Sequence, residues 1–130
     1  MSDKKKELSN YRLGQAKETL VVSKECYEGK HYKDSINRAY YSAFYAIKAV
    51  LALGEVDYKR HKDVIAYFNK NYVATNIFER DLGRKLGRLQ QKREKSDYDD
   101  FYIASFEEAK EQIEIAEFVI HKIESYLHSK

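Results

Sequence analysis

The sequence predicts an all-α protein, an up-and-down antiparallel bundle of about five helices built from one domain that spans residues 1–130. Its 130 residues contain no proline and only five glycines, the two residue types that most disfavour a helix interior. Several stretches repeat apolar residues every three or four positions, the spacing of one helix face. The length suits a single domain, which can bury one sizeable core without disulfide or metal support.

The first two helices are expected at about 4–28 and 32–53, and each is followed by a glycine, Gly29 and Gly54. A glycine directly after a helix often ends it in the left-handed conformation, so both are predicted caps. The apolar residues of the first helix face two ways, which favours contact with a second chain. One side carries Leu8, Tyr11 and Val22, and the other carries Leu13, Leu20 and Tyr27.

Three further helices follow the loop EVDYKR at 55–60. A short helix is expected at about 61–71. The next is expected at about 76–95, with Asn76 capping its first turn. The segment SDYDDFYIAS lacks helical spacing and predicts a structured loop. The last helix, from about Ser105 to His128, opens with the capping-box pattern Ser105-Phe-Glu-Glu108.

Apolar seams on three of these helices predict the walls of the bundle. The last helix has the clearest period. The predicted core residues are Ile36, Tyr40, Ala43, Phe44, Ile47, Val50 and Leu51 in the second helix; Phe78, Leu82, Leu86 and Leu89 in the fourth; and Phe106, Ala109, Ile113, Ala116, Ile120, Ile123 and Leu127 in the last.

Overall composition excludes some classes of protein and identifies no partner. The net charge of +3 is too small to indicate nucleic-acid binding without regard to its distribution. No apolar run approaches the roughly 18 residues of a membrane span. The single cysteine, Cys26, and the absence of a signal-peptide pattern at the start predict a cytoplasmic protein. Twelve of the eighteen aromatic residues are tyrosines, which suggests polar contacts within the core or a surface that stacks on a ligand.

Charge is distributed unevenly towards the C-terminal end. Residues 80–95 hold seven cations against two acids, and residues 97–117 hold eight acids against one lysine. Pairing between these two antiparallel neighbours is the simplest explanation. Gly83 and Gly87, in the middle of the basic helix, predict a close approach by another backbone, from the same chain or from a dimer mate. The cations expected on the exposed stripe of this helix are Arg80, Arg84, Arg88 and Lys92.

Arg93 departs from that stripe, because it continues the apolar line that ends at Leu89. A cation on an inward face needs a partner, and Asp97, Asp99 and Asp100 follow directly. One interpretation is an Arg–Asp pair that ends the helix; the other is an arginine held over a phosphate site.

A second stripe, on the helix at 32–53, mixes cations with tyrosines. This pattern suits a phosphate backbone and stacked bases. It also suits tyrosines that pack beside the core while the cations extend to solvent. Its members are Arg38, Tyr41, Tyr45 and Lys48.

Other chemistry finds little support in the sequence. The polar face of the last helix carries Glu114, Glu117, His121, Glu124 and His128, but metal sites in bundles need inward carboxylates and histidines from several helices. We therefore predict no metal site and no cofactor. His61 is expected to make a hydrogen bond at a helix end. No Ser-His-Asp, Cys-His or HExxH arrangement is visible.

Three segments in order, NRAYYSAFYAIKAVL, HKDVIAYFNKNYV and RLQQKREKSDYDDFYIAS, followed by an acidic last helix, resemble the HEPN domain family from about Leu8 to Leu127. The chain is most similar to small stand-alone HEPN proteins encoded beside a minimal nucleotidyltransferase. The resemblance implies a helical bundle, a homodimer, and a role in RNA cleavage, nucleotide binding or a toxin–antitoxin pair. In related systems the partner adenylylates a tyrosine near the family's arginine motif, and Tyr98 is the position that resembles this target.

Ribonucleases of the family carry an arginine followed, after four to six residues, by a histidine. Arg93 matches the arginine, but Tyr98, Asp99 and Asp100 stand where the histidine is expected. Without an imidazole the cleavage step lacks its natural acid or base, although Tyr98 or His61 could substitute.

Three hypotheses follow. In the first, a dimer cleft lined by Arg38, Tyr41, Tyr45, Arg93, Asp97 and Tyr98 binds RNA or a nucleotide and is regulated by the nucleotidyltransferase. In the second, the chain is a divergent metal-independent ribonuclease that uses Arg93, with Tyr98 or another improvised group. In the third, it is a non-catalytic dimeric adaptor and the Arg93–Asp97 pair is architectural.

Overall fold

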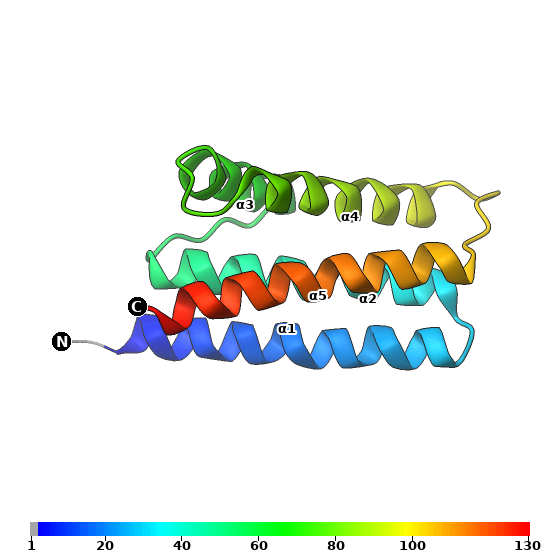
Figure 1. Ribbon diagram of the computed structural model, residues 1–130, viewed down its shortest axis with the longest axis horizontal. Helices are drawn as coiled ribbons and strands as arrows, with labels where there is room; N and C mark the ends of the chain where they lie inside the picture. Colours follow the sequence, from blue (N-terminus) through cyan, green and yellow to red (C-terminus); the bar gives the residue numbers. More distant parts are fainter. Residues whose placement is uncertain (1–2) are drawn as a thin grey trace.

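A computed structural model describes residues 3–130 of the chain. In this range five α-helices follow one another without a strand, and successive long helices run antiparallel (Figure 1), so the predicted all-α bundle is confirmed. A π-helical turn, η1, continues α3. The elements are α1 (Lys4–Glu28), α2 (Tyr32–Leu53), α3 (His61–Phe68), η1 (Asn69–Val73), α4 (Arg80–Tyr98) and α5 (Phe106–His128).

The bounds of α1 and α2 match the prediction, but α4 begins later and ends later than expected. The predicted cap Asn76 lies in the left-handed region, with φ at 65°. There it helps to close the turn after η1, and its N–H donates to the carbonyl of Val73. Glu79 instead precedes the first helical residue, and α4 continues three residues past Lys95. Asparagine suits both a cap and a left-handed turn, so sequence alone did not distinguish the two.

The predicted left-handed caps at Gly29 and Gly54 are wrong by one residue. Both glycines have negative φ, whereas the residues after them, Lys30 and Glu55, have φ of 64° and 61°. The N–H of His31 reaches back to the carbonyl of Cys26, which makes Lys30 the reversing residue of a Schellman motif.

Small residues bring α1 and α2 together. Ser9, Ala16 and Ser23 recur every seven residues on α1 and are all buried. The hydroxyl of Ser9 donates to the carbonyl of Ala49, and the hydroxyl of Ser23 donates to the carbonyl of Ser35. The hydroxyl of Ser35 in turn donates to the carbonyl of Ser23. These contacts satisfy the buried hydroxyls, which would otherwise destabilise the pair.

The core is built mainly by the predicted seams of α2, α4 and α5. Phe106 is an exception, since half of its side chain is exposed at the start of α5. On α1 the predicted second face is also present: Leu8, Tyr11 and Val22 lie on the surface. No helix of residues 3–130 combines the length and apolar character that crossing a membrane would need.

The predicted pairing between the basic helix and the acids that follow it is present in part. Lys92 of α4 pairs with Glu108 of α5 at 2.9 Å, whereas two other acids of α5 pair with lysines of α1, in the pairs Lys24–Glu117 and Lys17–Glu124. The prediction considered neighbours in sequence, whereas α5 also packs along α1. The outer part of the basic helix therefore stays in solvent, and the Arg84 side chain is 72% exposed.

The two glycines of α4 behave differently. A Cβ at Gly83 would lie 3.0 Å from a methyl carbon of Val73, so η1 does approach closely there, although through a side chain and not through the predicted backbone. At Gly87 nothing in the described chain lies within 4 Å of such a Cβ, so the close neighbour predicted there does not come from this chain.

Candidate functional site

Arg93 lies against the core side of α4, as its place on the apolar line predicts. Its side chain is 11% exposed, and its guanidinium carbon lies 4.7 Å from the ring centre of Tyr40 and 5.8 Å from that of Tyr41. Both tyrosines belong to α2. A cation over an aromatic face is attracted by the ring and needs less hydration than in an apolar pocket.

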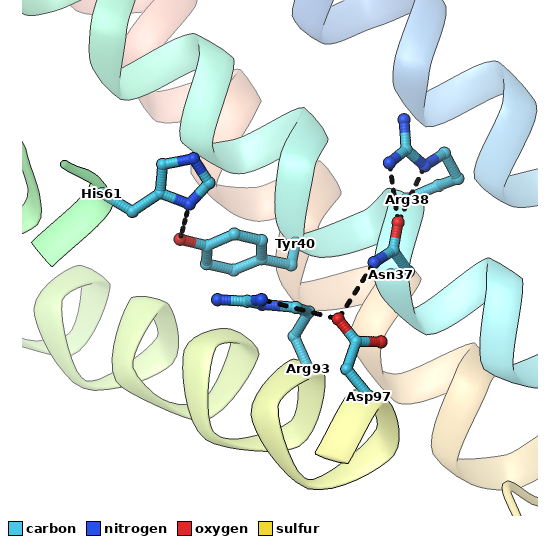
Figure 2. Close-up of polar contacts among 6 residues, drawn as sticks. All are labelled: Asn37, Arg38, Tyr40, His61, Arg93 and Asp97. Carbon is cyan, nitrogen blue, oxygen red and sulfur yellow. Dashed lines mark hydrogen bonds and ion pairs between the residues drawn. The ribbon is translucent and has the colours of Figure 1, made fainter. Parts of the chain in front are cut away.

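A polar chain links Arg93 to α2 (Figure 2). Arg93 pairs with Asp97 at 3.5 Å, the partner that the sequence predicts. The side-chain amide of Asn37 donates to the same carboxylate oxygen at 3.3 Å, and Arg38 donates through two nitrogens to the side-chain oxygen Oδ1 of Asn37. Asn37 was not predicted; the only signal was its position directly before Arg38. The chain of contacts holds the end of α4 against the start of α2.

The guanidinium remains a fixed positive charge. Burial by itself lowers the pKa of Arg93, but the neighbouring Tyr40, Tyr41, Tyr98 and Asp97 outweigh burial and raise it. An arginine is charged at any physiological pH. The effect of these neighbours is therefore to stabilise the charged guanidinium of Arg93 where it is partly shielded from solvent. Among the described residues the guanidinium of Arg93 forms one ion pair, with Asp97. At 3.5 Å this pair is long for a charge-assisted hydrogen bond.

The stripe predicted on α2 borders this cluster. Arg38 lies over the ring of Tyr41, at 4.9 Å, and Tyr45 packs next to Tyr41, with 6.2 Å between ring centres. All three side chains are half-buried. The tyrosines therefore pack beside the core and also adjoin Arg93, with Tyr45 one ring farther away than Tyr41.

His61, the first residue of α3, reaches the same aromatic group from the opposite direction. Its Nδ1 lies 3.5 Å from the hydroxyl of Tyr40 (Figure 2). Its ring centre also lies 4.2 Å from that of Phe44. The expected hydrogen bond to a helix end is replaced by this side-chain contact. Burial first, then the charges of Arg93 and Lys48, lower the pKa of His61. Tyr40 was not predicted as part of the site, and His61 was named there only as a substitute acid or base, because no local pattern relates either residue to Arg93.

Tyr98 is the last residue of α4 and is 75% exposed. It is close enough to Arg93 to influence the pKa of the guanidinium. The structure thus brings together Arg38, Tyr41, Arg93, Asp97 and Tyr98, and adds Asn37, Tyr40 and His61.

The sequence that builds this site also matches a known protein family. Residues 9–126 match the HEPN domain, which is nearly the whole chain. The chain belongs to the HEPN domain family. Among similar HEPN proteins, "Putative toxin MJ0142" of Methanocaldococcus jannaschii is 30% identical over 118 residues, 91% of this chain and 80% of that protein. A "UPF0332 protein" of Thermotoga maritima is 28% identical over 127 residues, 98% of this chain and 96% of that protein.

Proposed function

We propose that this HEPN chain is the toxin-type component of a pair with a minimal nucleotidyltransferase and that it binds RNA through the cluster around Arg93. The observation that carries the proposal is Arg93 itself: a guanidinium held over Tyr40, with one long ion pair, at the position that matches the family's arginine. The names of relatives as toxins support the biological role.

The chemistry of the cluster favours a phosphate group as the ligand. A guanidinium can hold two phosphate oxygens at once, and Asp97 engages only one of its terminal nitrogens. Arg38 adds a second cation, and Tyr41 lies beneath it. Arginine next to an aromatic ring is a common arrangement for stacking an unpaired base. RNA is favoured over a free nucleotide because the two arginines belong to different helices, and a chain of nucleotides offers a separate phosphate to each.

Regulation by the partner would act at Tyr98. Tyr40 is fully buried and Tyr41 half-buried, whereas Tyr98 is exposed beside Asp97. It is therefore the tyrosine of this cluster that a second enzyme can reach. Adenylylation would add a phosphodiester next to Arg93 and compete with RNA for the guanidinium.

We also propose a homodimer, in which a second copy covers the loop between α4 and α5. Phe101 and Ile103 are 92% and 87% exposed on this loop, which adjoins Tyr98. Sedimentation of the purified chain is expected to show a dimer, and Phe101→Ser with Ile103→Ser is expected to shift it to a monomer. A wild-type monomer at all accessible concentrations would exclude this arrangement.

RNA binding can be tested by fluorescence anisotropy with a labelled single-stranded RNA in EDTA. Arg93→Ala is expected to weaken binding by roughly 10- to 100-fold, the range for losing one charged phosphate contact. Arg80→Ala, on the exposed stripe of α4, is the matched control and should change affinity by less than about threefold. Arg93→Ala that binds RNA normally but unfolds more easily would instead support the adaptor hypothesis.

The partner can be tested separately. A minimal nucleotidyltransferase gene beside this one should encode an enzyme that transfers AMP from ATP to the wild-type chain. Mass spectrometry should place the group on Tyr98, and Tyr98→Phe should not be labelled. Labelling of another residue would contradict the assignment of Tyr98.

A further inference from the structure

A groove between α4 and α5 has no part in the cluster around Arg93. The two helices pack against each other in antiparallel directions (Figure 1), and the groove between them holds about 350 Å³. Arg88, which lines it, is five residues before Arg93, so the two arginines point about 140° apart around α4. The lining residues are Arg88, Gln91, Lys92 and Lys95 of α4 with Glu111 and Gln112 of α5.

Gln112 is the most deeply buried residue of this α4–α5 groove and has no partner for its amide. It is 1% exposed, its Oε1 is enclosed, and the amide forms no hydrogen bond with another described residue. An unpaired buried amide is costly, so the site favours a ligand that pairs with it. Because the protein holds neither amide atom, rotation about the last side-chain bond can present oxygen or nitrogen to the groove. Gln112 can therefore bind either the N–H or the carbonyl of a peptide group.

Two cations of the groove are available to hold an anionic ligand. The side chain of Arg88 is exposed and forms no ion pair with another described residue. The ammonium group of Lys95 lies 5.8 Å from the ring centre of Tyr102, also without an ion pair. Lys92, in contrast, is paired with Glu108. Arg88 and Lys95 are two turns apart on one side of α4, about 10 Å along its axis.

Gly87 and Glu111 favour a polypeptide over a nucleic acid in this groove. Nothing in the described chain lies within 4 Å of a Cβ at Gly87, so another backbone can come close beside Arg88. The exposed carboxylate of Glu111 repels a chain that carries a phosphate on every unit, but it can accept from a backbone N–H. In an extended segment, side chains two and four residues apart point the same way and lie about 7 and 13 Å apart. These spacings bracket the distance from Arg88 to Lys95.

We propose that the α4–α5 groove docks an extended acidic segment of a protein partner. Its carboxylates pair with Arg88 and Lys95, and one of its peptide groups pairs with Gln112. Lys95 precedes Tyr98 by three residues, less than one helical turn, so a partner docked here lies next to that tyrosine. The partner that we assign to the groove is the enzyme proposed above to modify Tyr98, and this assignment rests on the proposed function.

Docking is tested by fluorescence anisotropy at low salt, with a short labelled peptide of alternating glutamate and glycine as the probe. The wild-type chain should bind it and should not bind a peptide of alternating lysine and glycine. Arg88→Ala combined with Lys95→Ala should weaken binding roughly tenfold. Arg80→Ala combined with Arg84→Ala removes the same charge from α4 outside the groove and should change affinity by less than about twofold.

Gln112→Leu separates ligand binding from packing in the core. Leucine is similar in size and has no amide to satisfy, so this variant should unfold at the same or a higher urea concentration than the wild type. It should nevertheless bind the glutamate peptide several-fold more weakly, because a peptide group of the ligand loses its partner. A stable Gln112→Leu variant that binds this peptide as the wild type does would overturn the docking site.

RNA binding gives the contrary result its meaning. If Arg88→Ala with Lys95→Ala weakens binding of single-stranded RNA roughly tenfold and leaves the glutamate peptide bound, the groove belongs to the nucleic-acid site and the docking proposal is overturned. Wild-type chain that binds RNA but not the glutamate peptide also overturns the docking proposal, while the proposed function stands.

The assignment of the partner is tested by AMP transfer to Tyr98 from the nucleotidyltransferase encoded beside this chain. Arg88→Ala with Lys95→Ala should raise the KM for the chain roughly tenfold and leave kcat unchanged, since Tyr98 itself is intact. Labelling of Tyr98 with an unchanged KM would overturn the assignment and leave the proposed function standing. Absence of labelling on the wild-type chain would overturn the proposed regulation, and the peptide assay would still decide whether the groove is a docking site.

Discussion

Arginines of one helix have different roles according to the side of α4 on which they lie. Arg84 extends into solvent and pairs with Asp81 on its own helix, a contact of little energetic value. Arg93 is nearly enclosed by two tyrosines, Asp97 and the start of α2. Desolvation makes its interactions stronger than those of the exposed arginines. The proposed RNA binding depends on this difference and not on the number of cations.

Asp97 competes with any phosphate for Arg93. Asp97→Asn removes a negative charge beside the site but keeps the shape, so RNA affinity at low salt should rise by about threefold to tenfold. The same variant should unfold slightly more easily, since Arg93 and Asn37 lose a charged acceptor. Anisotropy titrations check this, with Asp100→Asn as the control. Weaker binding by Asp97→Asn would mean that the carboxylate positions the guanidinium for the ligand.

Replacing each of the two glycines of α4 by alanine should change the free energy of unfolding differently. Gly87→Ala should raise the free energy of unfolding by about 0.5–1 kcal/mol, since alanine favours a helix and nothing lies near the new methyl group. Gly83→Ala should gain nothing or lose stability, because its Cβ would press on Val73 at 3.0 Å. Urea denaturation measures both variants, and equal gains would contradict the close approach of η1.

The sequence predicted most accurately where the individual helices begin and end. α1 and α2 could be delimited from sequence because apolar spacing and end signals act within a few residues. The capping box of α5 is present as predicted: the N–H of Glu108 donates to the hydroxyl of Ser105, and the N–H of Ser105 donates to the carboxylate of Glu108. Errors occurred where one residue type suits two conformations, as at Asn76, or where the chain turned one residue later, as at Lys30 and Glu55.

Glu108 gives the start of α5 a predictable pH dependence. Its hydrogen bond with Lys92, then that with the backbone of Ser105 and the nearby Tyr102, lower its pKa from 4.5 to about 2. A lowered carboxyl pKa stabilises the fold above the ordinary pKa, and this stability is lost as pH falls towards 2. Glu108→Gln should therefore cost about 1 kcal/mol at pH 7 and progressively less below pH 4.5.

Urea denaturation of the wild-type chain and of Glu108→Gln at pH 7 and pH 3 checks this dependence. Glu111→Gln, which lies in the exposed part of α5, is the control and should show no such difference. A cost for Glu108→Gln that is the same at both pH values would rule out the ionised capping box as its source.

The whole bundle depends on how closely α1 and α2 approach. Ala16 lies midway between Ser9 and Ser23, whose hydroxyls bond to the backbone of α2, and it is fully buried. A larger side chain there must separate the helices. Ala16→Leu should destabilise the protein by about 1–3 kcal/mol, measured by urea denaturation.

Val21→Leu on the exposed side of α1 adds one methylene group without such a constraint and should be nearly neutral. If Ala16→Leu were equally neutral, the close packing of α1 on α2 would be wrong. The spacing of seven between the small residues was present in the sequence, but serine and alanine carry little apolar signal, so the seam was not predicted.

The sequence by itself determined the helical class, the bounds of the first two helices, most of the core and the inward direction of Arg93 with its partner Asp97. These follow from helical periodicity and from contacts within one turn, which are local. Tertiary structure alone decided that the acids of α5 meet lysines of α1, that Asn37 joins Asp97, and that His61 reaches Tyr40 beside Arg93. Such contacts depend on the rotation and order in which whole helices pack, and no short stretch of sequence specifies either.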